Sequence, residues 1–229
     1  MFLIYGIGDL HLDYSKEKPM DIFGDQWIDH EEEIFKNWQA LVMDKDLVLL
    51  PGDISWALKL DEAYNDLKRI DVLPGNKIIT KGNHDYWWQG PKKMKELNLK
   101  TITFLHNNSY IYDDIGIGGC RGWLSKDTEG FDSHDEKIFN RELSRLELSL
   151  SSIKNSVYKK IAMLHYPPFN MDRTPNEFVD ILKEHQVDVC MYGHLHAEGH
   201  KLVVEDVIHG IQFYCVSSDY IKFTPKKII

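Results

Sequence analysis

Residues 76–88 read NKIITKGNHDYWW, a short apolar run that passes directly into a cluster of polar side chains. The first five residues have the composition of a β-strand that is buried on both faces. Behind a glycine follow an amide, an imidazole and a carboxylate, those of Asn83, His84 and Asp85. Such a string is either a polar loop or one wall of a reaction site, and the rest of the chain distinguishes the two.

The same change from apolar strand to polar side chains recurs along the chain. Apolar runs over residues 2–8, 46–50, 160–165 and 187–192 each end in, or are followed by, aspartate or histidine. Ligands of α/β proteins gather outside the carboxyl ends of the strands, so these side chains are expected to meet. The complete set is Asp9, His11, Asp53, Asn83, His84, His165, His194 and His196.

The remaining elements follow from hydrophobic periodicity. Further β-rich runs cover residues 101–105, 110–119, 201–207 and 211–216, and helical patterns cover 30–43, 58–70, 135–154 and 175–185. Asp29 with Glu32, and Thr174 with Glu177, predict capping boxes at the starts of the first and last helices. The apolar side chains within 139–153 form one stripe, which is typical of a helix packed on a sheet. Strands and helices alternate first and strand pairs follow, which predicts an α/β domain with helices outside mixed sheets.

Length and composition restrict the class of protein. A chain of 229 residues, 43% apolar and 28% charged, is typical of one folded domain, here expected over residues 1–229. The formal net charge is −9, which disfavours a non-specific nucleic-acid binder because such a surface repels phosphates at long range.

The cysteines and the N-terminus indicate where the protein acts. Cys120, Cys190 and Cys215 are odd in number and far apart, which favours neither a disulfide framework nor a thiolate zinc site. Reduced thiols predict a cytoplasmic protein. The first residues lack the basic and long apolar regions of a signal peptide, and no run reaches the ~18 apolar residues of a membrane span.

The residue types gathered at the strand ends point to metal ions. Imidazole suits zinc and iron, and carboxylate or amide oxygen suits harder ions such as manganese. Four histidines, two aspartates and one asparagine exceed the needs of one tetrahedral ion, but they fit two ions if a carboxylate bridges them. Asp9 and His11 are two positions apart, so in an extended chain both side chains leave on the same side. A single D-x-H is a weak signal, since another lies at residues 132–134, and only the joint pattern favours a metal site.

The chain resembles the calcineurin-like metallophosphoesterases in these motifs. D-x-H lies at residues 9–11, G-D at 52–53, G-N-H-D at 82–85, a lone histidine at 165 and G-H-x-H at 193–196. The resemblance implies a four-layer α/β/β/α sandwich of two mixed sheets. It also implies two divalent ions, which the donor types leave open as manganese, iron or zinc. One ion would be held by Asp9, His11, Asp53 and His196, and the other by Asn83, His165 and His194 together with a bridging Asp53.

Such a site would hydrolyse phosphomonoesters or phosphodiesters. Two cations clamp the attacking and leaving oxygens of an in-line displacement, and a water held between them becomes the nucleophile. His84 stays off the ions and is predicted to protonate the leaving oxygen, with Asp85 on its other ring nitrogen. Asp85 could equally be a cap or turn residue. Arg121, between two glycines, could grip a phosphate bidentately or be a surface arginine in a turn.

Two other functions stay open. A non-catalytic interaction module on the same fold should have lost ligands or the off-metal histidine, whereas this chain keeps all of them. A nuclease would need a basic groove, which the negative charge disfavours, so the expected partner is a small phosphoester. Four tryptophans follow the motif-bearing strands and would line an apolar cleft or pack in the core: Trp56, Trp87, Trp88 and Trp123.

Overall fold

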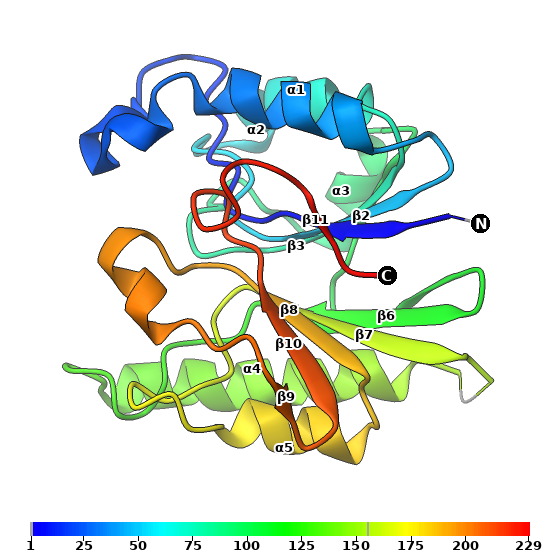
Figure 1. Ribbon diagram of the computed structural model, residues 1–229, viewed down its shortest axis with the longest axis vertical. Helices are drawn as coiled ribbons and strands as arrows, with labels where there is room; N and C mark the ends of the chain where they lie inside the picture. The colour runs from blue at the N-terminus through cyan, green and yellow to red at the C-terminus, as the bar shows by residue number, and fades with distance from the viewer. Residues whose placement is uncertain (1, 155) are drawn as a thin grey trace.

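Two stacked β-sheets form the centre of the protein, and helices cover both outer faces (Figure 1). The computed structural model describes residues 2–154 and 156–229. Its four layers are helices, sheet, sheet and helices, as predicted. That the whole chain forms a single domain stays a prediction.

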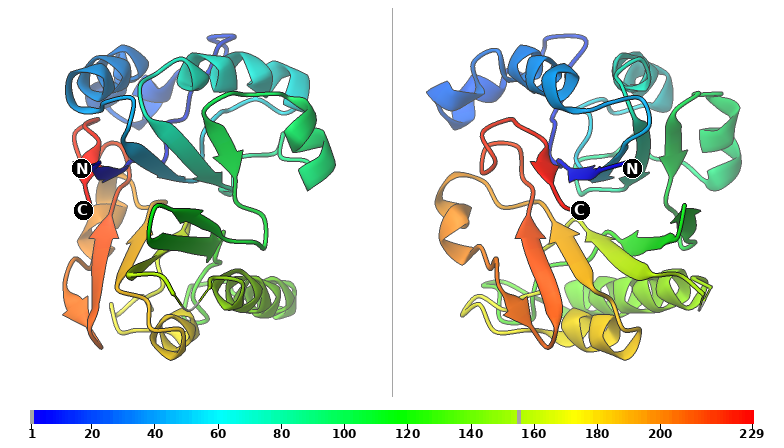
Figure 2. Two further views of the ribbon diagram at one scale, coloured as in Figure 1. Left: turned by 90° about the vertical axis from the view of Figure 1, so that its right-hand side faces the viewer. Right: turned by 45° about the vertical axis from the view of Figure 1, so that its right-hand side comes forward.

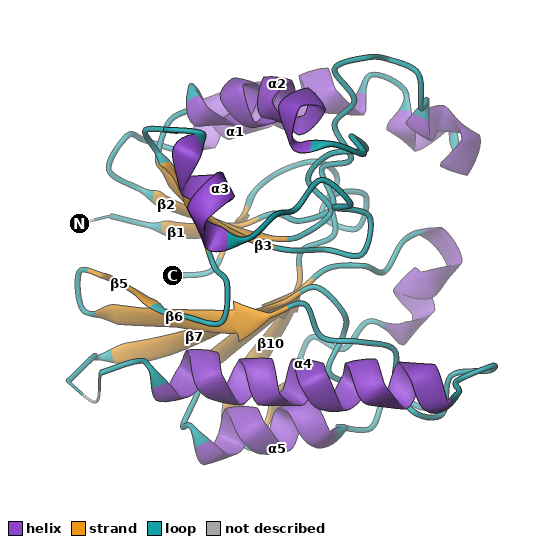
Figure 3. Ribbon diagram, turned by 180° about the vertical axis from the view of Figure 1, so that it is seen from behind, coloured by secondary structure: helices purple, strands orange, loops and turns teal. Residues whose placement is uncertain are grey.

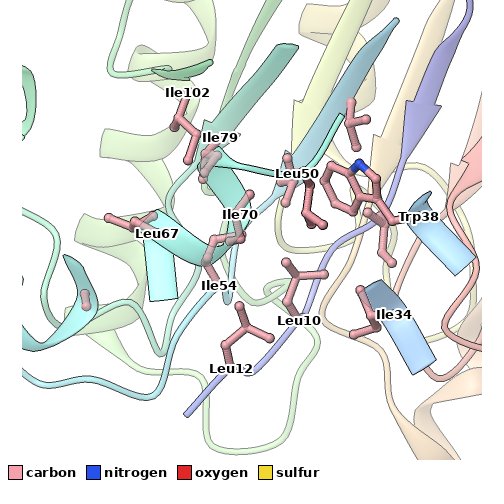
Figure 4. Close-up of a cluster of buried hydrophobic side chains, with 14 of the residues drawn as sticks. Leu10, Leu12, Ile34, Trp38, Leu50, Ile54, Leu67, Ile70, Ile79 and Ile102 are labelled. Carbon is pink, nitrogen blue, oxygen red and sulfur yellow. The ribbon is translucent and has the colours of Figure 1, made fainter. Parts of the chain in front are cut away.

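The first sheet carries the early motifs. Within the described residues it has the strand order β11-β1-β2-β3-β4. Four strands run parallel, namely β1 (Ile4–Gly6), β2 (Leu47–Pro51), β3 (Asn76–Thr80) and β4 (Ile102–Phe104), and β11 (Lys226–Lys227) pairs antiparallel with β1. Its outer face packs against α1 (His30–Leu41), α2 (Leu60–Asp71) and α3 (Pro91–Glu96). Figure 4 shows this core, where Trp38 of α1 and Leu67 of α2 lie with Leu50 of β2.

The second sheet carries the later motifs. Its strand order in the described chain is β5-β6-β7-β8-β10-β9. The parallel strands are β6 (Ile115–Cys120), β7 (Lys159–Leu164), β8 (Val189–Tyr192) and β10 (Ile211–Cys215), and the antiparallel edges are β5 (Tyr110–Tyr112) and β9 (Val207–Ile208). Figure 2 shows α4 (Ser133–Ser151) and α5 (Glu177–Glu184) beneath this sheet.

The continuously apolar strands are explained by burial on both faces. Side chains alternate along a strand, so Val48 and Leu50 of β2 face the helices while Leu47 and Leu49 face the second sheet. In β7, Ile161 and Met163 face the first sheet and their neighbours face α4 and α5. The central strands of both sheets are therefore covered on both faces, and the clustered polar residues of the motifs come at the strand ends.

The loops at those ends gather at the end of the sandwich opposite the termini (Figure 3). They include the 3₁₀ helices η1 (Met20–Phe23), η2 (Asp25–Trp27) and η3 (Ala197–Leu202). No helix in the described ranges is long and apolar enough to cross a membrane.

Three local predictions need correction. Residues 201–207 do not form a strand, since η3 and a loop occupy most of that run and β9 begins only at Val207. The expected capping box at Asp29 does not form, because Asp29 has a left-handed backbone (φ 54°) and its side chain caps nothing. The last helix starts at Glu177, where the Asn176 side chain accepts a hydrogen bond from the Phe178 N–H, so Asn176 and not Thr174 is its cap.

Candidate metal centre

Both sheets supply side chains to one cluster at their carboxyl ends. Asp9 and Asp53 follow β1 and β2, and His165 follows β7. The Asp53 carboxylate lies 3.5 Å from His165 Nε2, and the Asp9 carboxylate lies 3.8 Å from His165 Nδ1. All three side chains are buried, and their donor atoms lie close enough together to hold one ion.

A second group of donor atoms shares Asp9. His196 Nε2 lies 3.6 Å from the Asp9 carboxylate, and His11 Nε2 lies 3.8 Å from that of Asp53. Asp9, His11 and His196 can also hold an ion between them. These three residues belong to the first ligand set implied by the resemblance. The fourth member of that set, Asp53, lies 3.8 Å from His11 Nε2.

The remaining predicted ligands meet around one amide. The Asn83 side-chain oxygen lies 2.6 Å from His165 Nε2 and 3.0 Å from His194 Nδ1. Burial, reinforced by His165, lowers the pKa of His194 to about 3, so its imidazole is neutral and able to coordinate a cation. The structure thus brings all seven predicted ligands together, and their role as ligands stays a prediction.

The backbone at these positions is unusual. Four of the seven residues have a left-handed φ: Asp9 (55°), His11 (47°), Asp53 (51°) and His194 (72°). Residues other than glycine rarely adopt this conformation, and such residues cluster at functional sites. The premise of an extended chain at Asp9 and His11 was therefore wrong, although both side chains do enter the same cluster.

Two motif glycines make room for the carboxylates. A Cβ atom on Gly82 would collide with the Asp53 side chain, and one on Gly193 would collide with the Asp9 side chain. The carboxylates are also held by the backbone, since the His84 N–H donates to Asp53 at 2.8 Å and the His194 N–H donates to Asp9 at 3.0 Å. The glycines of the G-N-H-D and G-H-x-H motifs are therefore steric requirements of the site.

The electrostatics indicate a place for cations. Burial and the adjacent Asp9 charge raise the pKa of Asp53 to about 8. Burial alone would lower the pKa of His196, but the hydrogen bond to Asp219 and the nearby Asp9 carboxylate raise it to about 10. Without ions, protons on Asp53 and His196 offset the negative charge that the carboxyl groups of Asp9, Asp53 and Asp219 would carry together. Bound divalent ions would replace these protons.

His196 has the arrangement of a metal-binding histidine. Its Nδ1 lies 2.8 Å from an oxygen of Asp219, whereas its buried Nε2 has no hydrogen-bond partner among the described residues. A carboxylate on the outer nitrogen orients a ligand histidine and raises its basicity. The residues present therefore fit a divalent ion.

Asp219 is a site residue that the sequence reasoning missed. It follows β10, and its other oxygen accepts from the Ala197 N–H at 3.2 Å and lies 3.2 Å from His200 Nε2. The signal was present, because Asp219 also comes shortly after an apolar strand, residues 211–216.

His84 lies at the mouth of the cluster with its ring off the predicted ligand groups. Its ring centroid lies 4.5 Å from that of Trp56 and 5.8 Å from that of His11. Burial and the nearby His165 lower its pKa. This placement suits a proton donor beside the ions, the role predicted from the sequence.

Asp85 does not contact the His84 ring as expected. Its two oxygens accept hydrogen bonds of 2.7–3.0 Å from buried N–H groups, namely the backbone of Gly82, Asp53 and Ile54 and the indole of Trp87. Burial and the Asp53 charge raise its pKa to about 6. Asp85 therefore joins the loops after β2 and β3, which corrects its predicted part in orienting His84.

Arg121 lies beside the cluster. Its guanidinium lies 3.3 Å from the buried Glu142 carboxylate and stacks 4.3 Å above Trp123. Its carbonyl oxygen accepts from the His165 N–H at 3.0 Å, which places its backbone next to a predicted ligand. Its side chain is only 14% exposed and is paired with Glu142, so Arg121 is not a freely solvated turn residue, and its contact with phosphate stays a prediction.

The four tryptophans have different surroundings. Trp56 stacks on His11 at 4.8 Å and lines an apolar cavity of about 120 Å³ beside His84, together with Trp27 of η2. Trp87 is fully buried on Asp85, Trp88 donates to His106 and Trp123 packs on Arg121. Of the four, only Trp56 lines this cavity in the described structure.

The second D-x-H motif proves to be local structure. Asp132 is the N-cap of α4 and accepts from the N–H groups of His134 (2.7 Å) and Asp135 (3.0 Å). It lies outside both groups of candidate ligands.

An α/β/β/α sandwich with a buried aspartate–histidine cluster across the ends of both sheets defines the class of metallophosphoesterases. A family model described as calcineurin-like phosphoesterase matches residues 2–198. The chain belongs to this calcineurin-like phosphoesterase family, and the membership supports a hydrolase.

The chain is also similar to individual proteins, in sequence to one relative and in fold to two solved structures. The uncharacterized protein MJ1445 of Methanocaldococcus jannaschii is 23% identical over 175 residues, which span 74% of this chain and 87% of the relative. The phosphopantetheinyl hydrolase of Mycobacterium tuberculosis superposes with a TM-score of 0.60 at 13% identity, covering 99% of this chain and 95% of the other. A protein of unknown function from Aquifex aeolicus, AQ665, gives a TM-score of 0.51 at 17% identity, with coverages of 99% and 96%.

Proposed function

We propose that the protein hydrolyses phosphomonoesters or phosphodiesters of small molecules with two divalent ions. The observation that supports this most strongly is the convergence of seven side chains with oxygen or imidazole donors from both sheets, among them the carboxylates of Asp9 and Asp53. Membership of the calcineurin-like phosphoesterases agrees with it.

Each predicted ligand has a place in this proposal. Asp9, His11 and His196 would hold one ion, Asn83, His165 and His194 would hold the other, and Asp53 would contact both. When bound, manganese, iron or zinc ions would polarise the phosphoryl group and activate a water for in-line attack.

The chain itself supplies the proton and the positioning. A ring nitrogen of His84 would carry a proton to the leaving oxygen, since the ring lies at the mouth of the cluster and off the ligand groups. Asp85 would act indirectly, by holding the loop that carries Asp53. Arg121 would bind an anionic group of the substrate, and two observations support this: its guanidinium is mostly buried, and its backbone carbonyl accepts from the His165 N–H.

The test is an activity screen over phosphomonoesters and phosphodiesters, repeated with manganese, iron and zinc. Asp53→Asn should lower metal content at both positions and abolish turnover. Asp132→Asn is the matched control, because asparagine also caps helices and Asp132 only caps α4. Full metal content and normal rates in the Asp53 variant would refute the proposal.

The same screen separates the two other functions. Bound metal without turnover on any ester would favour a non-catalytic interaction module. Cleavage of oligonucleotides with a steep dependence on salt would favour a nuclease. We further propose a cytoplasmic location, which the three buried free thiols support.

A further inference from the structure

A pocket with an excess of positive charge lies beside the metal cluster. It has a volume of about 300 Å³, at the lower end of the range for small-molecule sites. Its charged lining consists of Lys81, Arg121, Arg145 and Glu142, with His106 beside them. We call this the basic pocket. Three cations face one carboxylate in a protein whose net charge is −9, so the local excess is not a property of the whole surface.

The two arginines are anchored by a single oxygen. Glu142 is fully buried, and its Oε1 lies 2.6 Å from Arg145 and 3.3 Å from Arg121. The other oxygen of Glu142 and the Nε of Arg121 are buried and have no partner in the described chain. The pair of guanidiniums is thus held in place while part of its hydrogen-bonding capacity is unused.

Lys81 adds a cation without any partner of its own. Within residues 2–154 and 156–229 its half-buried ammonium forms neither a hydrogen bond nor an ion pair, although it lines the basic pocket. Like charges that share a partly buried space repel one another, and an anion would relieve this repulsion. Guanidinium and ammonium groups together are the usual binders of phosphate oxygens.

The basic pocket adjoins the Asn83–His165–His194 side of the metal cluster. Lys81 lies two positions before Asn83, and the Arg121 carbonyl accepts from the N–H groups of His165 and Tyr166. The Tyr166 ring in turn packs 4.1 Å from that of His194. None of the predicted ligands lines the basic pocket itself, so a molecule held by the metal ions would have to reach it past Lys81 and Arg121.

We propose that the basic pocket binds a second phosphate group of the substrate. This inference rests on the proposed phosphoesterase function, and it narrows the substrate class to small molecules that carry two phosphate groups. One group would be cleaved at the metal ions while Lys81, Arg121 and Arg145 hold the other.

Binding can be tested without turnover by titrating the metal-loaded full chain with phosphonates, which are not hydrolysed. The probes are α,ω-alkane bisphosphonates of three to six carbons and the matched alkyl monophosphonates, measured by calorimetry with metal content checked. We expect at least one bisphosphonate to bind tenfold or more tightly than its monophosphonate. Lys81→Gln and Arg145→Gln should each lower the ratio of monophosphonate to bisphosphonate dissociation constants about tenfold, since one charge-assisted hydrogen bond contributes about a factor of ten in affinity.

Lys137→Gln is the matched control. Lys137 lies on the same helix as Glu142 and Arg145, is exposed and does not line the basic pocket. Equal losses in Lys137→Gln and Lys81→Gln would show a long-range charge effect and overturn the proposal, as would equal binding of mono- and bisphosphonates at every length. Because the Lys81 ammonium has no partner among the described residues, Lys81→Gln breaks no contact of the folded protein. A loss of binding in this variant is therefore not explained by misfolding.

Rates on the corresponding alkyl phosphates and bisphosphates separate this inference from the function on which it rests. Turnover of both ester types without any preference for bisphosphates would overturn the basic pocket as a substrate site and leave the phosphoesterase standing. No turnover of any ester, with the preference for bisphosphonates intact, would refute the phosphoesterase and support the pocket.

Discussion

At the level of single residues, His84 is the group whose chemistry can be isolated best. Its ring lies beside Trp56 and off both groups of candidate ligands. A nitrophenolate departs without a proton, whereas an alkoxide does not, so a general acid matters only for the second. The two ester types therefore report on different parts of the site.

We expect His84→Ala to keep its metal ions and to lose ~10²–10⁴ in rate on alkyl phosphates, with a far smaller loss on nitrophenyl phosphate. Only protonated His84 can act as the acid, and burial lowers the pKa of His84, so the active form becomes more abundant as the pH falls. The loss on alkyl esters should therefore be larger at pH 6 than at pH 8. Steady-state rates on both substrates give the ratio. Equal losses, or loss of metal, would make His84 a ligand or a positioning residue.

Asp219 acts on the metal cluster through His196. Asp219→Asn should weaken metal binding by about 10–100-fold, because the amide orients the imidazole less strongly and lowers its basicity. Calorimetric titration of the metal measures this. Asp172→Asn is the control, since Asp172 is exposed and, among the described residues, accepts side-chain hydrogen bonds only from Thr174. An unchanged metal affinity in the Asp219 variant would contradict the positioning role.

At the level of elements, β3 contains a buried lysine at its second position. Lys77 is 1% exposed, and its ammonium donates to the Thr101 hydroxyl at 3.0 Å and to the Leu73 carbonyl. Burial lowers its pKa from 10.5 to about 8. Below pH 8 the lysine is charged in both folded and unfolded chains, and the folded chain bears the full cost of burying it.

Between pH 8 and 10.5 the unfolded chain binds more protons at Lys77, so this residue makes stability rise with pH. Lys77→Met removes that contribution. We expect the free energy of unfolding of the wild type, relative to the variant, to increase by about 3 kcal/mol between pH 7.5 and 10.5. Urea titrations at both pH values test this, with the exposed Lys92→Met as control. A difference that does not change with pH would contradict the buried charge.

At the level of the whole molecule, the metal cluster joins the two halves of the sandwich. Asp9, Asp53 and Asn83 come from the first sheet, and His165 and His194 from the second. The chain that follows β10 returns to pair as β11 with β1. Metal ions would therefore connect the same two layers that the apolar core between the sheets holds together.

Metal binding should for that reason stabilise the fold as a unit. At a free metal concentration 100 times the dissociation constant, the gain is ~2.7 kcal/mol, which for a chain of this size raises Tm by about 5–10 °C. Scanning calorimetry with and without manganese or zinc measures the shift. Asp53→Asn should shift far less, and an equal shift in both proteins would mean that the ions bind elsewhere.

Much of this architecture is readable from the order of residues along the chain. The apolar runs identify most of the strands because a strand buried on both faces must be apolar throughout. The run over residues 110–119, however, forms two antiparallel strands, β5 and β6, and β11 lies outside every predicted run. The five polar strand ends identify all seven candidate ligands because parallel strands direct their carboxyl ends to the same edge. The stripe within 139–153 identifies the helix that packs on the second sheet.

Other features depend on contacts between segments that are distant in the chain. The Asp85 carboxylate contacts Asp53 N–H, 32 positions away, so no local pattern distinguishes this contact from one to its neighbour His84. Asp219 approaches His196 only because β10 lies beside β8. The basic pocket combines Lys81 after β3, Arg121 after β6 and Arg145 on α4. The motif residues can be predicted from the sequence because each directly follows its own strand. The groups that hold them, such as Asp85 and Asp219, and the basic pocket depend on which strands and helices the tertiary structure brings side by side.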